Sequence, residues 1–291
     1  MSLHFKRGTK LLFQDGINTY EVLISDFTIS ETFLEQGYNT DTLHNNTAIK
    51  ESVVVKAKSN ANFTFNMNLS DSSVVESKVL EWYGFPTAGT KSNLPESKES
   101  LNTRYDVYFV TITGLVIFID ECILENISFS LNPRQPLSWN ITGSGITSLI
   151  DAVTVPTLGT TYQQGTFRNE PLTVEIGGVP VDRLTGATFE LTKEVAWLDE
   201  NSVHESVSST LYIKDYAYCT GLSVSGTATK LKNNDSEPTK YDNTSIKIKA
   251  GEFLEIFINN ASVTERLSIA GVFTQQADFR AQNASGSYIK F

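Results

Sequence analysis

The segment from Asn126 to Gly145 alternates apolar and polar side chains on both sides of a central turn, Asn132 to Gln135. Its apolar positions are Ile127, Phe129 and Leu131 before the turn and Leu137, Trp139 and Ile141 after it. Alternation with a period of two predicts a pair of antiparallel strands with one buried face. The opposite face carries only Asn, Ser and Thr, whereas a face in contact with solvent usually also carries Lys and Glu. The chain therefore has to build β-sheet, and the absence of charge on that face needs an explanation.

The same pattern recurs near the end of the chain at a constant offset. Since 267 − 127 = 140 and 279 − 139 = 140, the later residues Leu267, Ile269, Gly271 and Phe279 occupy the positions of Ile127, Phe129, Leu131 and Trp139. The surrounding segments recur in the same order: residues 181–193 match 19–33, residues 217–231 match the strand within 52–69, and residues 253–258 match the strand around Val107.

This recurrence predicts a mainly β protein made of two tandem copies of one domain, and the length of 291 residues suits two domains. The first domain is expected over residues 1–145 and the second over 172–291. The segment 146–171 contains scattered Pro and Gly and is predicted to be an extended linker.

One short helix is predicted in the first half. Residues 71–73, Asp-Ser-Ser, can cap it, and Val75, Val79 and Trp82 follow at helical spacing up to Gly84. The corresponding part of the second half is polar and contains Pro238, so its helix is expected to be shortened or lost. Residues 1–14 are predicted to form an extended arm and residues 34–51 a long loop, and loops of that length are usually functional or interaction elements.

Composition limits the classes of partner. The net charge is −10, which argues against a surface that grips nucleic-acid phosphates but not against a protein that lies near nucleic acid without binding it. The opening segment has no long apolar run, so no secretory signal is expected, and residues 115–119 are far too short an apolar run to span a membrane. Cys122 and Cys219 are predicted to be buried free thiols.

No motif in the sequence predicts catalysis. None of His4, His44 and His204 has a neighbour at metal-ligand or nucleophile spacing, and the glycine pair around Ser144 is a weak match to a phosphate-binding loop. The acidic pairs at 120–121 and 199–200 could serve a glycosidase but are also typical of solvated turns. We therefore expect no enzyme activity, no metal and no cofactor, although a catalytic set assembled across strands remains open.

In these features the chain resembles the tail tube (major tail) proteins of long-tailed bacteriophages, in the type that carries two fused tube domains. The resembling stretches are MSLHFKRGTKLLF at the start, VYFVTITG followed by Asp120-Glu121-Cys122, ISFSLNPRQPLSWNITGSG, and GATFELT with GLSVSGTATKL in the second half. The resemblance implies two packed sheets or a split barrel per domain, flanked by a helix. It also implies trimeric, pseudo-hexameric rings that stack into a hollow tube for DNA in the virion tail, after synthesis in the host cytoplasm.

On this interpretation the uncharged polar faces line the channel, because Lys or Arg there would hold DNA phosphates and slow the passage of DNA. The lining is predicted to comprise Asn62, Thr64, Asn66, Asn68, Ser128, Ser130, Ser138, Asn140, Thr142, Ser223, Ser225, Thr227, Thr229 and Ser268. The contacts between rings are predicted to involve Phe5, Arg7, Leu11, Phe13, Tyr38 and Leu43. Other tail proteins are the remaining expected partners.

Two other functions stay open at the level of the sequence. A tail-tip or baseplate connector that caps the tube would share its fold, and sequence alone does not separate the two. A carbohydrate-binding β-sandwich module would need exposed aromatic residues on a polar face, whereas Trp82, Trp139 and Trp197 fall on apolar faces or near turns.

Overall fold

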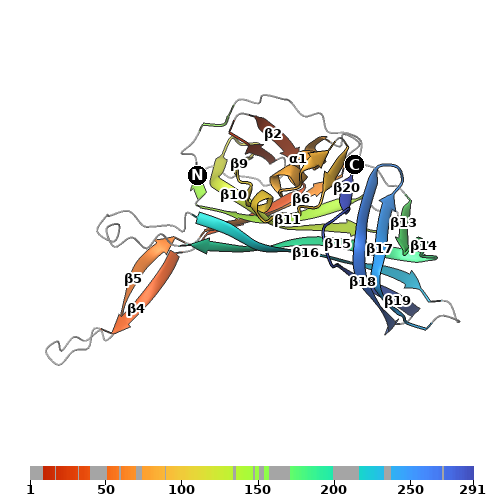
Figure 1. Ribbon diagram of the computed structural model, residues 1–291. Coiled ribbons are helices and arrows are strands. Elements are labelled where there is room, and N and C mark those ends of the chain that lie inside the picture. The colour runs from red at the N-terminus through yellow and green to blue at the C-terminus, as the bar shows by residue number, and fades with distance from the viewer. Residues whose placement is uncertain are drawn as a thin grey trace.

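The regular elements of the computed structural model are mainly antiparallel strands, with one α-helix among the described residues (Figure 1). The described residues are 9–16, 18–31, 33–39, 51–58, 60–69, 74–88, 90–133, 136–146, 148–150, 154–156, 171–198, 216–232, 237–270 and 272–291. This confirms the predicted mainly β fold with one short helix.

Seven strands of the first half form two sheets that share one long strand. They are β1 (Lys10–Gln14), β2 (Thr19–Leu23), β3 (Asp26–Ser30), β6 (Ala61–Asn68), β9 (Tyr105–Val110), β10 (Val116–Leu131) and β11 (Ser138–Gly145). Their pairing order is β2–β1–β9–β10–β11–β6–β3. The register of β10 shifts between Ile119 and Cys122, and Glu121 there has a φ of 43°. At this bulge β10 passes from one sheet into the other, so the two sheets enclose a common core.

The helix α1 (Val74–Trp82) fills part of that core. Val75 and Val79 are buried, and the Trp82 ring stacks on Phe13 and Phe63 with centroid distances of 5.2 and 6.2 Å. Gly84 has a φ of +97° and lies so close to Ser100 that an added Cβ would be 2.2 Å from its carbonyl oxygen. The predicted helix and its buried stripe are confirmed, while the capping residues 71–73 lie outside the described residues.

The second half repeats the first strand by strand. Its strands are β13 (Leu172–Ile176), β14 (Val179–Pro180), β15 (Leu184–Leu198), β16 (Tyr216–Leu231), β17 (Lys240–Ala250), β18 (Leu254–Ala270) and β19 (Val272–Ala281). They pair in the order β14–β13–β17–β18–β19–β16–β15, so each pairing of the first half has a counterpart. The recurrence seen in the sequence therefore corresponds to a repeated topology.

The residue-level alignment of the two halves needs correction. Residues 253–258 include the start of β18, from residue 254, and correspond to the first part of β10, whereas the counterpart of β9 is β17. In the closing hairpins Phe129 lies opposite Trp139, but Val263 lies opposite Phe279. The separations are 139 − 129 = 10 and 279 − 263 = 16, so the second hairpin extends three residue pairs further. Leu267 falls in this extension and is 40% exposed, which explains why the constant offset misplaced it.

The predicted loop 34–51 overlaps two strands at its ends. β4 (Phe33–Asn39) and β5 (Glu51–Lys58) pair only with each other among the described strands and project from the body (Figure 1). The sequence LEQGYN in β4 has no apolar alternation, so a test for one-sided burial could not find it. The other short elements missed by the prediction are β7 (Thr87–Ala88), β8 (Lys91–Asn93), the 3₁₀ turn η1 (Glu99–Asn102), β12 (Ser148–Ile150) and β20 (Tyr288–Lys290).

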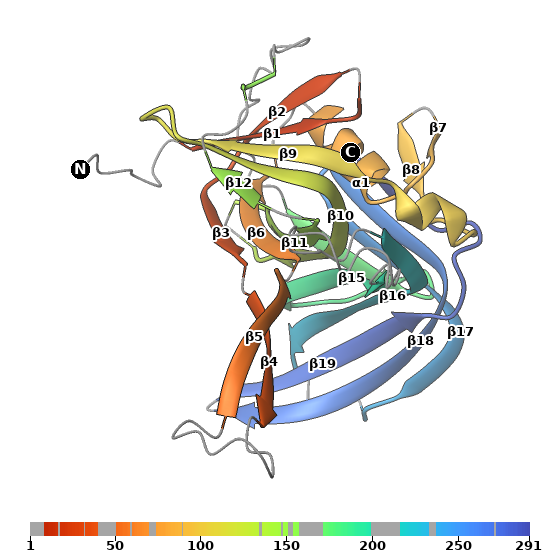
Figure 2. The same cartoon turned by 90° about the vertical axis from the view of Figure 1, so that its left-hand side faces the viewer.

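The two halves join edge to edge. Residues 126–131 of β10 pair with residues 187–192 of β15, which creates one continuous series β3–β6–β11–β10–β15–β16–β19–β18. Figure 2 shows β15 and β16 beside β10 and β11. β20 also links the halves, because it pairs with both β18 and β8. The boundaries at residues 145 and 172 stay predictions, since the halves share this sheet.

Candidate functional site

The joined sheet carries a continuous polar face. One row of directly paired residues crosses eight strands and comprises Asp26, Asn66, Asn140, Ser128, Glu190, Ser225, Arg280 and Ser262. A second row comprises Asn68, Ser138, Ser130, Thr188, Thr227, Asp278 and Thr264. These residues alternate with core residues along each strand, so they share the face turned away from the core.

The strand registers bring the predicted lining residues of both halves onto this polar face. They lie on β6, β10, β11, β16 and β18, and none of them is buried. Ser268 lies in the extended part of the last hairpin, beyond the two rows. Hydrogen bonds tie neighbours together: Asn140 Nδ2 donates to Asn66 Oδ1 at 2.6 Å, and the Thr188 and Thr227 hydroxyls are 2.9 Å apart.

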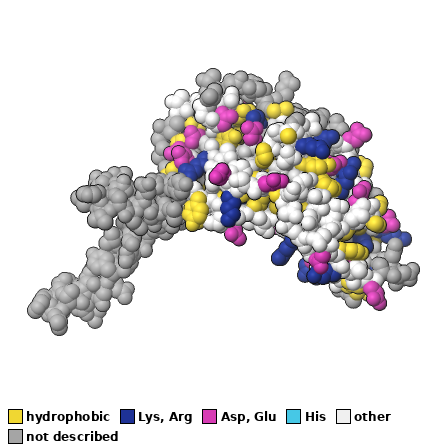
Figure 3. Space-filling view, viewed as in Figure 1, with side chains coloured by type: hydrophobic (Ala, Val, Ile, Leu, Met, Phe, Trp, Pro, Cys, Tyr) yellow, Lys and Arg dark blue, Asp and Glu magenta, His cyan; other side chains and the backbone are white. Residues whose placement is uncertain are grey.

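The polar face is uncharged over β6, β10 and β11 but not over the second half. The charged residues on it are Asp26, Glu190, Glu194, Arg266, Asp278 and Arg280. Arg266 forms an ion pair with Asp278. Figure 3 shows Lys and Arg side chains gathered at the lower right, where β18 and β19 lie. The alternation along β18 and β19 could have located Arg266, Asp278 and Arg280 in the sequence. Arg266 follows Ser262 and Thr264 at a spacing of two residues, and Asp278 and Arg280 pair with Thr264 and Ser262.

The residues predicted to contact a neighbouring ring have different positions. Leu11 and Phe13 are fully buried in the core, so their side chains are not available to another chain, and we no longer assign this role to them. Their alternation with Lys10 and Gln14 reflects a strand that packs on β9, not an exposed arm. Phe5, Arg7 and Leu43 lie outside the described residues, and of Tyr38 the structure describes the backbone, in β4.

The tryptophans are not arranged for sugar binding. Trp82 and Trp139 are buried in the core, and Trp197 is partly buried with its Nε1 donating to the Ser144 hydroxyl at 2.9 Å. None of the three tryptophans is fully exposed, so they do not supply the exposed aromatic residues that a carbohydrate-binding module would need.

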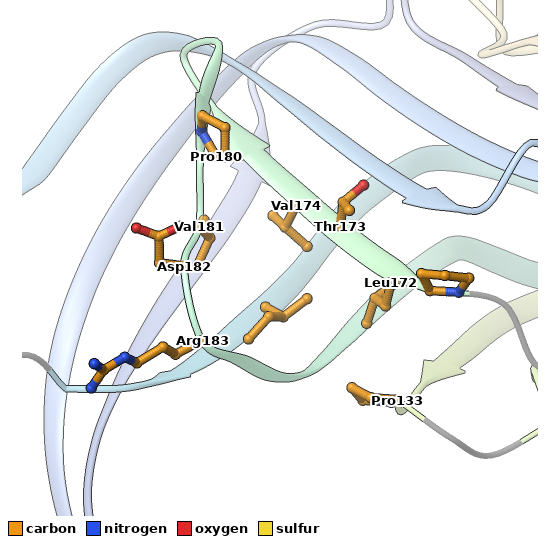
Figure 4. A pocket seen from close by; sticks show the side chains of 10 residues that line it. Pro133, Leu172, Thr173, Val174, Pro180, Val181, Asp182 and Arg183 are labelled. Carbon is orange, nitrogen blue, oxygen red and sulfur yellow. The ribbon is translucent and has the colours of Figure 1, made fainter.

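The hollow in Figure 4 has no catalytic set. It lies between the β13–β14 hairpin, the start of β15 and Pro133, and the ionisable residues among those that line it are Asp182 and Arg183. Within the described ranges no group of three or more His, Cys, Asp or Glu is placed to hold a metal ion. Among the helices described, none is long and apolar enough to cross a membrane.

The two cysteines are free and buried, as predicted. Burial raises the pKa of the Cys122 thiol well above its usual value, so this thiol stays protonated and is a poor nucleophile. Cys219 lies at the boundary between the halves, where its backbone N–H donates to Asn102 Oδ1 at 2.8 Å.

A buried lysine also lies at this boundary. Lys193 of β15 is 4% exposed, its Nζ donates to the Leu101 carbonyl at 2.8 Å, and the Tyr83 ring centroid is 4.4 Å away. Burial lowers the pKa of Lys193 to about 7. Sequence alternation alone could have found it, because Lys193 is in phase with the buried Phe189 and Leu191.

Two repeats joined into one sheet, with a broad polar face and no catalytic set among the described residues, define a structural subunit built for assembly. The chain belongs to the Bacteriophage Baseplate Tube Protein Family, whose model matches residues 1–291. It is therefore a structural, non-enzymatic, tube-forming component of the phage virion that assembles with other tail and baseplate proteins. No curated protein matches the chain. The family supports the baseplate alternative better than the expected major tail tube subunit.

Proposed function

We propose that three copies of the chain form a ring of the baseplate tube, and that their joined sheets enclose a channel for DNA. The observation that supports the ring is the β10–β15 joint, which links two copies of one repeat inside the chain. In the series of paired strands, β3 stands at one end and β18 at the other. Since β3 is the counterpart of β15 and β18 the counterpart of β10, the same joint can form between neighbouring copies.

Closure also removes an unfavourable feature of the single chain. β3 pairs with β6, and its other edge has no partner among the described strands. An unpaired edge carries backbone N–H and C=O groups that can pair with any other strand, and closing a sheet into a ring removes that edge. The joint inside the chain shows the geometry that such a contact would copy.

The polar face is the side of the sheet proposed to line the channel. The opposite side of this sheet packs against the core, in which Trp82 and Phe63 lie, so it is not free to meet DNA. Asn, Ser and Thr side chains offer no fixed positive charge to phosphates, and the carboxylates of Asp26 and Glu190 repel them. Over the uncharged strands β6, β10 and β11, DNA can then pass without being held. The β4–β5 hairpin and the segment before β1, which includes Phe5 and Arg7, are the proposed contacts with the next ring.

The lining is tested by the double substitution Asn66→Lys and Asn140→Lys. These residues are directly opposite in β6 and β11, so the change places two adjacent cations on the polar face of every subunit. We expect recombinant phage to eject DNA several-fold more slowly, with the delay largest at low salt because the added contacts are electrostatic.

The matched control is Asn66→Gln with Asn140→Gln, which changes the same positions without adding charge. Particles carrying this control are expected to eject DNA at the wild-type rate. Equal rates for the Lys and Gln variants, in particles assembled to the same extent, would show that this face does not line the channel.

A further inference from the structure

The edge of β10 is divided between two partners. β9 pairs with its first part, from Val116 to Cys122, and β15 pairs with residues 126–131. The counterpart of this second part in β18 follows from the closing hairpins, in which Phe129 faces Trp139 and Val263 faces Phe279. Residues 260–265 of β18 therefore correspond to the part of β10 that takes β15.

In the second half the chain itself occupies this edge. Lys240, Tyr241 and Thr244 of β17 pair with Thr264, Val263 and Ala261 of β18. This result does not depend on the exact alignment of the halves. An alignment shifted by one residue pair gives residues 262–267 as the counterpart, and these still include Val263 and Thr264, which pair with β17. We call residues 239–243 the edge segment. They cover the part of the β18 edge whose counterpart on β10 pairs with β15.

The edge segment is attached to β18 mainly by polar contacts. Thr239 donates from its backbone N and its hydroxyl to Glu265 Oε2 at 3.0 and 2.9 Å, and the Ser262 hydroxyl donates to Asp242 Oδ1 at 3.1 Å. Residues 240–243 are exposed, including Tyr241 at 41%. An incoming strand can supply equivalent hydrogen bonds, so exchanging one for the other costs little free energy.

The rest of β17 is attached differently. Its buried side chains Ile246, Ile248 and Ala250 belong to the hydrophobic core. Between the two parts the register shifts on both sides of Thr244, and Asn243 has a φ of 56°. This irregular stretch separates a core strand from an exposed extension, so the edge segment can leave β18 without disturbing the core.

We propose that the edge segment covers the β18 edge in the free chain, and that β3 of a second copy displaces it when the ring closes. The proposal rests on the ring proposed above and names the surface at which two copies meet. A second copy is the occupant that fits, because β3 is the counterpart of the strand that fills this position on β10. In the free chain the covered edge is protected from pairing with other strands.

A disulfide that locks the edge segment tests the proposal. The Glu265 N–H donates to the Thr239 carbonyl at 2.9 Å, so Lys240 and Thr264 form the adjacent pair without such a bond. Cα atoms in pairs of that kind are about 4.5 Å apart, within the range that a disulfide spans. The test variant is Lys240→Cys with Thr264→Cys, and the native cysteines are both buried.

The matched control is Val110→Cys with Val116→Cys in the β9–β10 hairpin of the first half. In the neighbouring pair the Thr111 N–H donates to the Leu115 carbonyl at 2.9 Å. Val110 and Val116 are therefore also a pair without backbone hydrogen bonds, like Lys240 and Thr264. Ring formation by the purified chains is measured by sedimentation velocity and negative-stain microscopy, with and without reductant.

We expect both reduced variants to form rings, the oxidised control to form them equally well, and the oxidised Lys240→Cys/Thr264→Cys chain to remain monomeric until reductant is added. Rings of the oxidised test variant at the level of the oxidised control would overturn the displacement proposal and leave the ring itself standing. Failure of the wild type and both reduced variants to form rings would overturn the ring, and this proposal with it.

Discussion

Lys193 lies among apolar residues of β15, and its protonation is coupled to folding. In the unfolded chain a lysine keeps its proton up to a pH of about 10.5, whereas in the folded chain burial lowers the pKa of Lys193 to about 7. Between these two values the unfolded state binds more protons than the folded state, so the free energy of unfolding rises with pH.

Lys193→Met is expected to remove this pH dependence. From pH 7 to 9.5, the stability of the wild type should increase relative to the variant by at most about 1.4 kcal/mol per pH unit. Denaturant titrations of both chains across this range provide the measurement. The range stops below pH 10 because burial raises the pKa of Tyr83 and Tyr105. These tyrosines add their own pH dependence to the stability above about pH 10, where the unfolded chain begins to lose their protons. Parallel stability curves for the two chains would show that Lys193 does not titrate in this range.

At the scale of elements, the β10–β15 joint carries a specific polar contact. Asn126 Nδ2 donates to Glu190 Oε1 at 2.7 Å and to Thr192 Oγ1 at 2.9 Å, across the boundary between the halves. Asn126→Asp would replace the donor by a carboxylate next to Glu190. We expect the free energy of unfolding to fall by roughly 0.5–1 kcal/mol, as for like charges on neighbouring strands.

Adding Glu190→Gln to the Asn126→Asp chain supplies an amide donor and is expected to restore most of the loss. Chemical denaturation of the two single variants, the double variant and the wild type gives the coupling between the positions. An Asn126→Asp chain as stable as the wild type, or one that Glu190→Gln does not rescue, would show that this contact does not hold the joint.

Sequence patterns predicted the elements whose burial is one-sided. Phe63, Phe65 and Met67 in β6 alternate with polar residues because one face of β6 meets the core, and α1 was found from its buried stripe. β4 escaped because its residues Leu34 to Asn39 show no apolar alternation. The joint also escaped, since no local pattern specifies which distant strand pairs with Asn126. The polar face was predicted from uncharged residues of both halves, so Arg266 and Arg280, which alternate with core residues on β18 and β19, were missed.

For the whole molecule, the balance of charge on the polar face matters more than the net charge of −10. Arg266 is paired with Asp278, whereas no described residue forms an ion pair with Arg280, which is exposed. If the polar face lines a channel, Arg280 is the lining cation best able to contact a phosphate.

Arg280→Gln is therefore expected to speed DNA ejection modestly and to reduce its salt dependence, by about one phosphate contact per subunit at most. The matched control is Arg266→Gln, which removes the ion-pair partner of Asp278. Because Arg266 is already paired, this change should not speed ejection through the loss of a phosphate contact. Ejection rates of both recombinant phages over a range of salt concentrations provide the measurement. A larger acceleration for Arg266→Gln than for Arg280→Gln would contradict this assignment of roles.

The unequal closing hairpins have a consequence for symmetry. The β18–β19 hairpin extends three residue pairs beyond its counterpart β10–β11, although the strand order of the two repeats is the same. In a three-copy ring, the wall would repeat every sixth of a turn while the rim would carry three tall projections alternating with three short ones. A protein that docks on that rim would meet a surface with threefold symmetry. One subunit could therefore connect a tube wall with pseudo-sixfold symmetry to a trimeric neighbour.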